Sequence, residues 1–414
     1  MTPIPDRLER ADWLQTGPLA RLLAVLNREG EEARVVGGAV RNALLNEAIG
    51  EIDVATTAPP EEVIRRAEQA GFKTVPTGIA HGTVTVVADG IPFEVTTLRQ
   101  DVETFGRKAK VAFGRDWKLD AERRDFTINA LSVTPDGVIH DYVGALADLA
   151  HRRVIFIGDA ARRIAEDYLR ILRFFRFHAA YGDGMPDAAG LRACIAARAG
   201  LDNLSRERLR MELIKLLLAP HATPVLAVMT ETGILVTVLG GVPLLASFEN
   251  ICKVEAATQT PPDAARRLGA LGVIVTEDAE RLFQRLRLTN AEHERLASMG
   301  EYWWRIKPAL GERAARALLY RLGPERYIDR MLVAWARWWE ADAADPTWRD
   351  LATLPRRWTA PVFPLKAADF IARGVAKGPA LGRALAAAEA AWIEADFPRD
   401  KSALAAITDA ACAK

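Results

Sequence analysis

The sequence is poor in the residues that build disulfide scaffolds and metal clusters. Its 414 residues include only three cysteines, Cys194, Cys252 and Cys412, which lie far apart and form no Cys-x-x-Cys pair. Disulfide-rich domains and cysteine zinc sites need closely spaced cysteines, so both classes are excluded. The six histidines also lack the spacing of metal ligands. This composition suits a reducing compartment, and we expect a cytoplasmic protein.

Long apolar runs are missing as well. No stretch of about 18 apolar residues occurs, so we expect no membrane-spanning helix. The N-terminal residues MTPIPDRLERADWLQ include acids where a signal peptide would be apolar. The overall composition, 50% hydrophobic and 26% charged, is that of a globular protein, and its length predicts two or three domains. Nothing in the sequence indicates an obligate protein partner.

The net charge of +1 says little about partners, but the charges are unevenly distributed. Between Arg152 and Lys215 the chain has 13 Lys or Arg against 8 Asp or Glu. A local surplus of this kind attracts phosphate groups, although a solvated helical surface is an equally good explanation of charge alone.

The first 150 residues or so have mixed α/β character. Asp89-Gly90 is a strong turn signal between two β-type segments, so we expect a hairpin of residues 83–88 and 91–98. The stretch 101–119, which includes Gly106 and Arg107, is polar without clear periodicity and is expected to be a mobile loop. The other expected elements are strands at 34–36 and 52–55 and helices at 39–46 and 61–70.

From about Asp159 the pattern becomes helical, because apolar residues recur at intervals of three and four. Eight of the ten tryptophans lie beyond residue 300, where helix packing explains them better than base stacking does. The fold class is therefore α+β: a head with a small mixed sheet, followed by an all-helical region.

A double glycine lies between an expected strand and an expected helix. In Val36-Gly-Gly-Ala-Val-Arg-Asn42, Gly37 and Gly38 expose backbone amides at a helix start, which can hold a triphosphate. Arg41 can add a bidentate phosphate contact. A simple turn is the alternative explanation.

Acidic residues follow about ten positions later. Glu51 and Asp53 are two residues apart, so on a strand both carboxylates would project from the same face. Oxygen ligands beside a phosphate site are what Mg²⁺ needs, and we expect these two residues to be the metal ligands. Glu94 on the hairpin is the candidate third carboxylate, although a surface position explains it equally well.

The segment Arg123-Arg-Asp-Phe-Thr-Ile-Asn-Ala130 has two interpretations. In one, Asp125 caps a helix and Phe126 is buried. In the other, Arg124 binds a phosphate and Asp125 binds a ribose hydroxyl, as selection of a ribonucleotide requires.

A row of charges marks the segment 166–177. Asp167, Arg170, Arg173 and Arg176 recur every three residues along an expected helix, and interleaved leucines and phenylalanines would bury the rest of it. An amphipathic helix with a solvated basic face is the alternative. An Asp carboxylate accepts from the amino group of C or A and repels the carbonyl of U or G, so such a row can select a base without a nucleic-acid template.

These motifs together resemble the bacterial, class II tRNA nucleotidyltransferases, relatives of DNA polymerase beta. The resemblance also includes Asp141-Tyr-Val-Gly-Ala-Leu-Ala-Asp-Leu149 and Glu207-Arg-Leu-Arg-Met-Glu-Leu213, and it extends over about residues 35–215. It implies a nucleotidyltransferase head at 1–150, a base-reading neck at 151–220 and a tRNA-binding helical body and tail at 221–414. The implied reaction adds CMP, CMP and AMP from CTP and ATP to the 3′ end of tRNA.

Residue by residue, the resemblance assigns a role to most of the candidates. Gly38 and Arg41 contact the nucleotide, Glu51 and Asp53 hold Mg²⁺, and Arg124 and Asp125 bind triphosphate and ribose. Asp167 and Arg170 read the base, with Arg173 and Arg176 next to them.

Two residues depart from the family pattern, which has Asp at the positions of Glu51 and Asn42. These departures motivate one alternative, a tRNA-binding module that has lost catalysis. Within the family, A-adding, CC-adding and poly(A)-adding activities are further alternatives. A stretch like 101–119 is absent from CC-adding members, and the chain lacks the basic tail of the poly(A) polymerases, which favours CCA addition.

Overall fold

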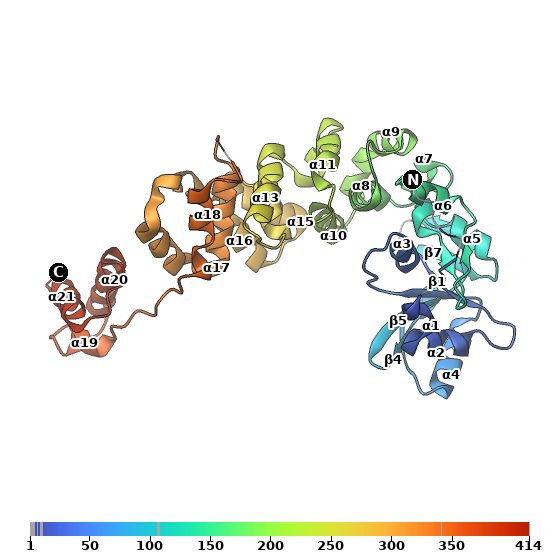
Figure 1. The fold of residues 1–414 in the computed structure, drawn as a ribbon, viewed down its shortest axis with the longest axis horizontal. Coiled ribbons are helices and arrows are strands. Elements are labelled where there is room, and N and C mark those ends of the chain that lie inside the picture. Colours follow the sequence, from blue (N-terminus) through green and yellow to red (C-terminus); the bar gives the residue numbers. More distant parts are fainter. Residues whose placement is uncertain (1–4, 6, 9–10, 106–107, 341, 414) are drawn as a thin grey trace. The chain divides into compact units, whose positions relative to one another are not determined.

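The computed structural model describes residues 5, 7–8, 11–105, 108–340 and 342–413 (Figure 1). By its internal contacts the chain divides into two compact units, Met1–Val238 and Leu239–Lys414. Over these described ranges, no helix combines the length and apolar character needed to cross a membrane. The subdivision of residues 1–220 into head and neck stays a prediction.

A mixed sheet of seven strands organises the N-terminal unit. Its strand order is β3-β4-β5-β2-β1-β8-β9, in which only β2 and β5 pair in parallel. The predicted small mixed sheet is therefore confirmed. Its strands are β1 (Ala33–Val36), β2 (Asp53–Thr56), β3 (Lys73–Gly78), β4 (Thr83–Ala88), β5 (Ile91–Thr97), β8 (Ser132–Val133) and β9 (Ile139–His140).

The predicted hairpin is confirmed as β4 and β5. Asp89 and Gly90 both have positive φ, at 51° and 80°, as a tight two-residue turn between twisted strands requires. Alternate residues of β4, Val84, Val86 and Ala88, are buried, because a strand that covers one face of a core alternates with a period of two.

The prediction of a loop at 101–119 is wrong for most of that stretch. Residues Arg99–Phe105 (β6) and Lys108–Phe113 (β7) form an antiparallel two-stranded ribbon, and Trp117–Glu122 (α5) is a helix. Gly106 and Arg107 lie outside the described residues. Lys108-Ala-Lys-Val-Ala-Phe113 alternates polar and apolar residues only over its first four positions, which is too short for a clear strand signal.

Short helices surround the sheet, and longer ones follow it (Figure 1). Buried aromatic rings, which include those of Phe126, Phe156 and Phe174, join the sheet region to the longer helices. The rings of Phe156 and Phe174 are stacked, with their centroids 5.3 Å apart. The helices of this unit are α1 (Asp12–Gln15), α2 (Gly17–Leu26), α3 (Gly38–Leu44), α4 (Pro60–Gln69), α5 (Trp117–Glu122), α6 (Ala145–Ala150), α7 (Ala160–Glu166), α8 (Leu169–Tyr181), α9 (Ala188–Ala196), α10 (Arg206–Leu217), α11 (Ala222–Glu231) and α12 (Ile234–Leu239), with 3-10 turns at Ile79–His81, Thr127–Asn129 and Arg198–Asn203.

The described residues of the C-terminal unit form helices and 3-10 turns joined by irregular segments, one of them at residues 358–366, and contain no strand. Trp335, Trp348 and Trp392 are fully buried, as the packing interpretation predicts, whereas Trp339 is 81% exposed. Gly323, with φ of 73°, kinks the longest helix just before Pro324. The helices are α13 (Leu245–Ala257), α14 (Ala264–Gly272), α15 (Thr276–Leu286), α16 (Asn290–Gly300), α17 (Gly311–Ala336), α18 (Pro346–Ala352), α19 (Ala367–Ile371), α20 (Pro379–Glu394) and α21 (Lys401–Cys412), with 3-10 turns at Trp303–Arg305, Pro308–Leu310 and Leu354–Arg356.

A network of buried charges stabilises this unit. Asp329 is 1% exposed and accepts hydrogen bonds from Arg266 and Arg295, while Glu255, also 1% exposed, pairs with Arg266 and Arg267. Each buried carboxylate thus faces two guanidinium groups, which is how a buried charge is tolerated.

Candidate functional site

One cavity of about 520 Å³ in the N-terminal unit gathers most of the predicted site residues. It lies between the start of α3, the segment after α5 and the helices α8 and α10. Its lining residues are Gly37, Gly38, Arg41, Asp53, Arg123, Arg124, Asp125, Asn129, Asp167, Leu169, Arg170, Arg173, Arg176, Phe177 and Arg208.

The double glycine forms the turn from β1 into α3. Gly37 has a φ of 71°, which is strained for any residue with a Cβ atom. A Cβ atom at Gly37 would lie 3.4 Å from Nη1 of Arg124, and one at Gly38 would lie 3.5 Å from Nη2 of Arg41. Both distances are ordinary van der Waals contacts, so the two glycines border the guanidinium groups, and only Gly37, through its positive φ, requires glycine.

Arg41 is buried beside the cavity, with 5% of its surface exposed. Its guanidinium donates hydrogen bonds to the side-chain oxygens of Asn42, Asn129 and Tyr181. Asn129 also donates to Asp125 through Nδ2, at 3.1 Å, so it connects α3 to the segment 123–130.

Two of the three predicted carboxylates are neighbours across the sheet. Asp53 and Glu94 are register partners on the parallel strands β2 and β5, so their side chains point to the same, solvent-facing side. The prediction that Glu51 shares a strand with Asp53 is wrong, because β2 begins only at Asp53. Glu51 lies in the exposed bend before β2, so the alternation of side chains along a strand does not determine where its carboxylate points.

Electrostatics nevertheless link the three acids. The pKa of Asp53 is raised, first by partial loss of hydration and then by the negative charge of Glu94, with Glu51 adding to the effect and Arg124 opposing it. Carboxylates that repel one another in this way suit a hard divalent cation, which relieves the repulsion. Across the described residues, no cluster of three or more His, Cys, Asp or Glu is arranged as a complete metal site.

Asp125 is almost fully buried and paired with α8. Its Oδ2 lies 2.6 Å from both Nε and Nη2 of Arg173, and its Oδ1 accepts from the amide of Phe126 and from Asn129. Burial alone would raise the pKa of Asp125, but Arg173 and these hydrogen bonds outweigh burial and lower it. Phe126 is buried, yet Asp125 caps no helix.

The paired arginines before Asp125 share one carboxylate. Asp120, on α5 and 3% exposed, lies 2.6 Å from Arg123 and 3.2 Å from Arg124. Arg124 also donates to the carbonyl of Asn129 at 3.3 Å. These contacts hold Arg124 against the double glycine.

The prediction of a continuous helix from Glu166 is wrong at Asp167. Helix α7 ends at Glu166, Asp167 is extended with φ of −156° and ψ of 107°, and α8 begins at Leu169. The physical reason is local, because Oδ1 of Asp167 accepts a hydrogen bond from the Leu169 amide at 3.1 Å, a turn that competes with the helix. Its Oδ2 accepts from Arg208 of α10 at 2.6 Å.

The three arginines of the row lie on α8, as predicted, and all line the cavity. Arg170 donates to Glu166 and to the carbonyl of Arg163 through Nη1. Arg173 and Arg176 both face Glu212 of α10, which is 7% exposed. The phenylalanines predicted to anchor this helix are buried: Phe174, Phe175 and Phe177.

Sequence reasoning assigned no role to several residues that shape this cavity. They are Asp120, Asn129, Tyr181, Arg208 and Glu212. Arg208 and Glu212 lie in the segment Glu207–Leu213, which was recognised only as a motif. The charged residues of that motif were the available signal that α10 faces a charged site.

The lining of the cavity is strongly basic, with seven arginines against three aspartates. A concave surface with this surplus concentrates anions. The geometry therefore suits an anionic ligand with a polar end that can meet Asp167 and Arg170.

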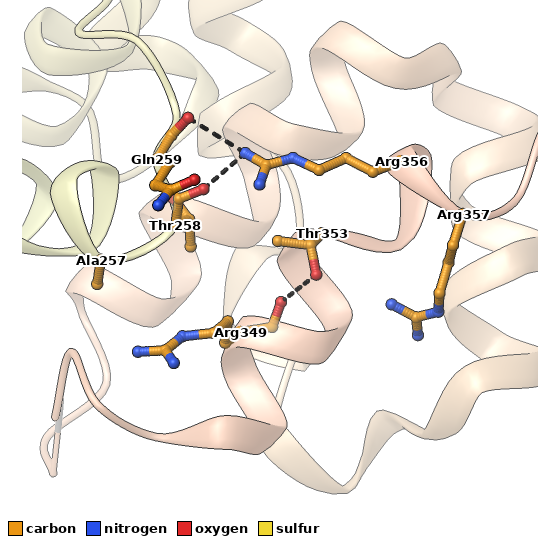
Figure 2. Close-up of a pocket in the computed structure, with 7 residues that line it drawn as sticks. All are labelled: Ala257, Thr258, Gln259, Arg349, Thr353, Arg356 and Arg357. Atoms are coloured by element: carbon orange, nitrogen blue, oxygen red, sulfur yellow. Dashed lines mark hydrogen bonds between the residues drawn. The ribbon is translucent and has the colours of Figure 1, made fainter.

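A second cavity, of about 410 Å³, lies in the C-terminal unit (Figure 2). Arg349, Arg356 and Arg357 line it, but Arg356 donates to the carbonyls of Thr258 and Gln259, and Arg357 pairs with Asp350 at 2.8 Å. Arg356 and Arg357 are thus engaged by other residues of the protein, and we assign this cavity no functional role.

Comparison with known proteins identifies the family. Residues 33–155 match the model of the poly A polymerase head domain, and residues 189–248 match that of a probable RNA and SrmB-binding site of polymerase A. The mitochondrial CCA tRNA nucleotidyltransferase 1 of Danio rerio is 32% identical over 416 residues, covering 94% of this chain and 90% of that one. The chain belongs to the CCA-adding tRNA nucleotidyltransferases.

Further relatives of this CCA-adding enzyme place it in the class II branch. The CCA-adding enzyme of Limosilactobacillus fermentum is 30% identical, covering 94% of this chain and 95% of that one. The crystal structure of the Bacillus stearothermophilus CCA-adding enzyme in complex with CTP superposes with a TM-score of 0.74 at 28% identity, covering 95% and 98% of the two chains. The resemblance inferred from the motifs is confirmed, and so is the fold class.

Proposed function

We propose that this CCA-adding enzyme adds CMP, CMP and AMP to the 3′ end of tRNA in the cavity between α3 and α8, using CTP and ATP and releasing pyrophosphate. The observation that carries the proposal is that one cavity contains the double-glycine turn, Asp53, and the base-reading candidates Asp167 and Arg170. A nucleotide bound there would meet phosphate-binding, metal-binding and base-reading groups together.

We assign binding of the nucleotide's triphosphate to the double-glycine turn of the head. Arg41 and Arg124 face the two glycines, and neither is neutralised by a carboxylate of its own: Arg41 has neutral hydrogen-bond partners, and Arg124 shares Asp120 with Arg123. Their positive charge is thus available to phosphate oxygens, which bind guanidinium groups well.

Asp53 is assigned to the metal, with Glu94 and Glu51 beside it. CCA-adding nucleotidyltransferases depend on a divalent metal, and we propose Mg²⁺ because the available ligands are carboxylate oxygens. When bound, the ion would supply charge neutralisation for the phosphates and lower the pKa of the attacking hydroxyl. The raised pKa of Asp53 fits a site that is completed by a cation.

The base is assigned to Asp167 and Arg170. Each oxygen of Asp167 has one hydrogen bond from the protein and so keeps a second acceptor position for an amino group of C or A. Within the described part of the chain, Nε and Nη2 of Arg170 have no protein acceptor and can donate to ring acceptors of the base. U and G present a carbonyl to Asp167 and would be rejected.

For Asp125 to bind the ribose, one of its present hydrogen bonds must be replaced by a bond from a ribose hydroxyl. Its two oxygens already accept from Phe126, Asn129 and Arg173, which fills the acceptor positions of a carboxylate. A ribose hydroxyl reaches Asp125 only if one of these bonds is given up. Otherwise Asp125 serves to hold Arg173.

The test is incubation with tRNA that lacks its CCA end, Mg²⁺, and labelled CTP followed by ATP. We expect label from both nucleotides, and none after the metal is chelated. Label from one nucleotide would indicate an A-adding or CC-adding enzyme, a long A tail a poly(A) polymerase, and no label a catalytically inactive tRNA-binding module.

Asp53→Ala tests the catalytic assignment. We expect incorporation to fall at least a thousandfold while tRNA binding persists, since a metal ligand commonly contributes several kcal/mol. Asp136→Ala is the control, because it removes an exposed carboxylate of the same unit outside the cavity. Normal turnover by Asp53→Ala would contradict the metal assignment.

We further propose a cytoplasmic location, which the three free cysteines support.

A further inference from the structure

Arg41 is a buried cation whose hydrogen-bond partners are all neutral. Its guanidinium reaches Asn42 Oδ1 at 3.0 and 3.2 Å, Tyr181 at 2.7 Å, and the side-chain oxygen of Asn129. Throughout the described ranges, no carboxylate lies within 4.0 Å of it. Burial lowers the pKa of Arg41, yet a guanidinium stays protonated in proteins, so a full positive charge lies at the cavity wall.

Tyr181 contacts this cation in two separate ways. Its hydroxyl oxygen accepts the hydrogen bond from Nη2, and its ring centroid lies 3.8 Å from the guanidinium carbon. A guanidinium that close to an aromatic face is attracted by the ring as well as by the hydroxyl. Tyr181 is half-buried and does not line the cavity itself, so it contacts Arg41 from the side that faces away from the cavity.

Tyr181 also joins two elements that are far apart in the sequence. It is the last residue of α8, the helix that carries Arg170 and Arg173, whereas Arg41 lies in α3 of the head. Stacking of its ring on Phe177, at 6.1 Å, fixes it within the buried side of α8.

We propose that Tyr181 is a positioning residue that aims the Arg41 guanidinium at the nucleotide triphosphate and so couples the base-reading helix to the phosphate-binding turn. The inference rests on the proposed function, in which Arg41 contacts the triphosphate. Because CTP and ATP share that triphosphate, loss of Tyr181 affects both nucleotides alike and leaves base selection unchanged.

The experiment measures KM and kcat for CTP and ATP in Tyr181→Leu, Tyr181→Phe and Arg41→Ala. Tyr181→Leu removes both contacts, and we expect KM for both nucleotides to rise about tenfold. Tyr181→Phe keeps the ring and loses only the hydroxyl, so its KM rises about threefold. The preference for C and A over U and G stays at the wild-type value, and KM for tRNA does not change.

The matched control is Tyr142→Phe. Tyr142 accepts a hydrogen bond from Arg34 at 3.1 Å, so this change also removes a hydroxyl from an Arg–Tyr pair of the same unit, but outside the cavity. We expect wild-type KM values. Thermal unfolding of each variant shows whether the fold is retained, and Tyr181→Phe keeps the test available if Tyr181→Leu does not fold.

The double variant Arg41→Ala with Tyr181→Leu distinguishes positioning from a general structural role. If Tyr181 acts through Arg41, its replacement adds less than a twofold change once Arg41 is gone. A full additional effect, or a wild-type KM in Tyr181→Leu beside an impaired Arg41→Ala, overturns the inference alone. A wild-type KM in Arg41→Ala instead overturns the proposed role of Arg41 in nucleotide binding.

Discussion

The buried Asp125 and the half-buried Arg173 form an ion pair that joins the segment before the 3-10 turn Thr127–Asn129 to α8. Nε and Nη2 of Arg173 both lie 2.6 Å from Oδ2 of Asp125, and the carboxylate is 9% exposed. Two side chains separated by 48 residues thus fix the cavity wall, and Arg173 favours the ionised form of Asp125.

This pair makes the stability of the N-terminal unit pH-dependent. The folded-state pKa of Asp125 is lowered, so its contribution is present above the unfolded value of about 4 and is lost as the pH falls through the folded value. At pH 7 we expect Asp125→Asn to lower the free energy of unfolding by about 3 kcal/mol. Urea unfolding from pH 7 to pH 3 should show this difference shrinking below pH 4.

The control for this experiment is Asp89→Asn. Asp89 pairs with Arg21 at the surface, and the substitution keeps a residue that suits the β4–β5 turn. An exposed pair contributes at most about 1 kcal/mol. A deficit in Asp125→Asn that stays constant down to pH 3 would contradict the assigned charge state.

Glu51 provides a test of the metal site, because it lies before β2 rather than in it. If Glu51 is a ligand, Glu51→Ala should raise the Mg²⁺ concentration for half-maximal CTP incorporation about tenfold or more, with the turnover restored at high Mg²⁺. Titration of the rate with Mg²⁺ gives this value directly. An unchanged half-maximal concentration would leave Asp53 and Glu94 as the candidates and remove Glu51.

Arg208 should influence base selection although it lies on α10. It donates to Oδ2 of Asp167 at 2.6 Å, so Arg208→Ala frees the carboxylate to rotate. We expect the ratio of kcat/KM for CTP to that for UTP to fall about tenfold, and Asp167→Ala to abolish most of it. Arg192→Ala, an exposed arginine on α9, is the control. Equal slowing with both nucleotides would indicate that Arg208 only supports the fold.

Asp329 should affect stability without affecting nucleotide binding. Asp329→Ala removes the shared partner of Arg266 and Arg295 in the buried network of the C-terminal unit. We expect a loss of about 3 kcal/mol in the unfolding of that unit. Binding of CTP in the absence of tRNA should keep its wild-type affinity. A change in that affinity would show that the network acts on the N-terminal unit as well.

Local signals predicted β1, β2, the β4–β5 hairpin and the glycine turn, but not β3, β8 or β9. Asp89-Gly90 indicated the hairpin because it is a strong two-residue turn signal, and the double glycine was identified by its place between an expected strand and an expected helix. The double glycine, the arginines of α8 and Asp125 could be identified because each lies in a short motif with a chemical purpose.

Nonlocal contacts could not be read from the sequence. The break at Asp167 was not predicted because charged residues spaced by three fit a continuous helix. The hydrogen bond that Asp167 accepts from the Leu169 amide competes with the backbone bonding of such a helix. The partners Arg208 and Glu212 lie more than 35 residues away from the side chains they hold. Only the packing of α10 on α8 brings them together.

The parallel pairing of β2 with β5 has a consequence for the evolution of this head. Because Asp53 and Glu94 are register partners, backbone hydrogen bonding sets the distance between the strands that carry them, about 4.8 Å. Insertions or deletions in the loops that connect β2, α4, β3 and β4 can therefore occur while leaving this distance alone. A one-residue slip of β5 would instead turn Glu94 into the core, so the intervening loops can vary freely but the strand itself cannot.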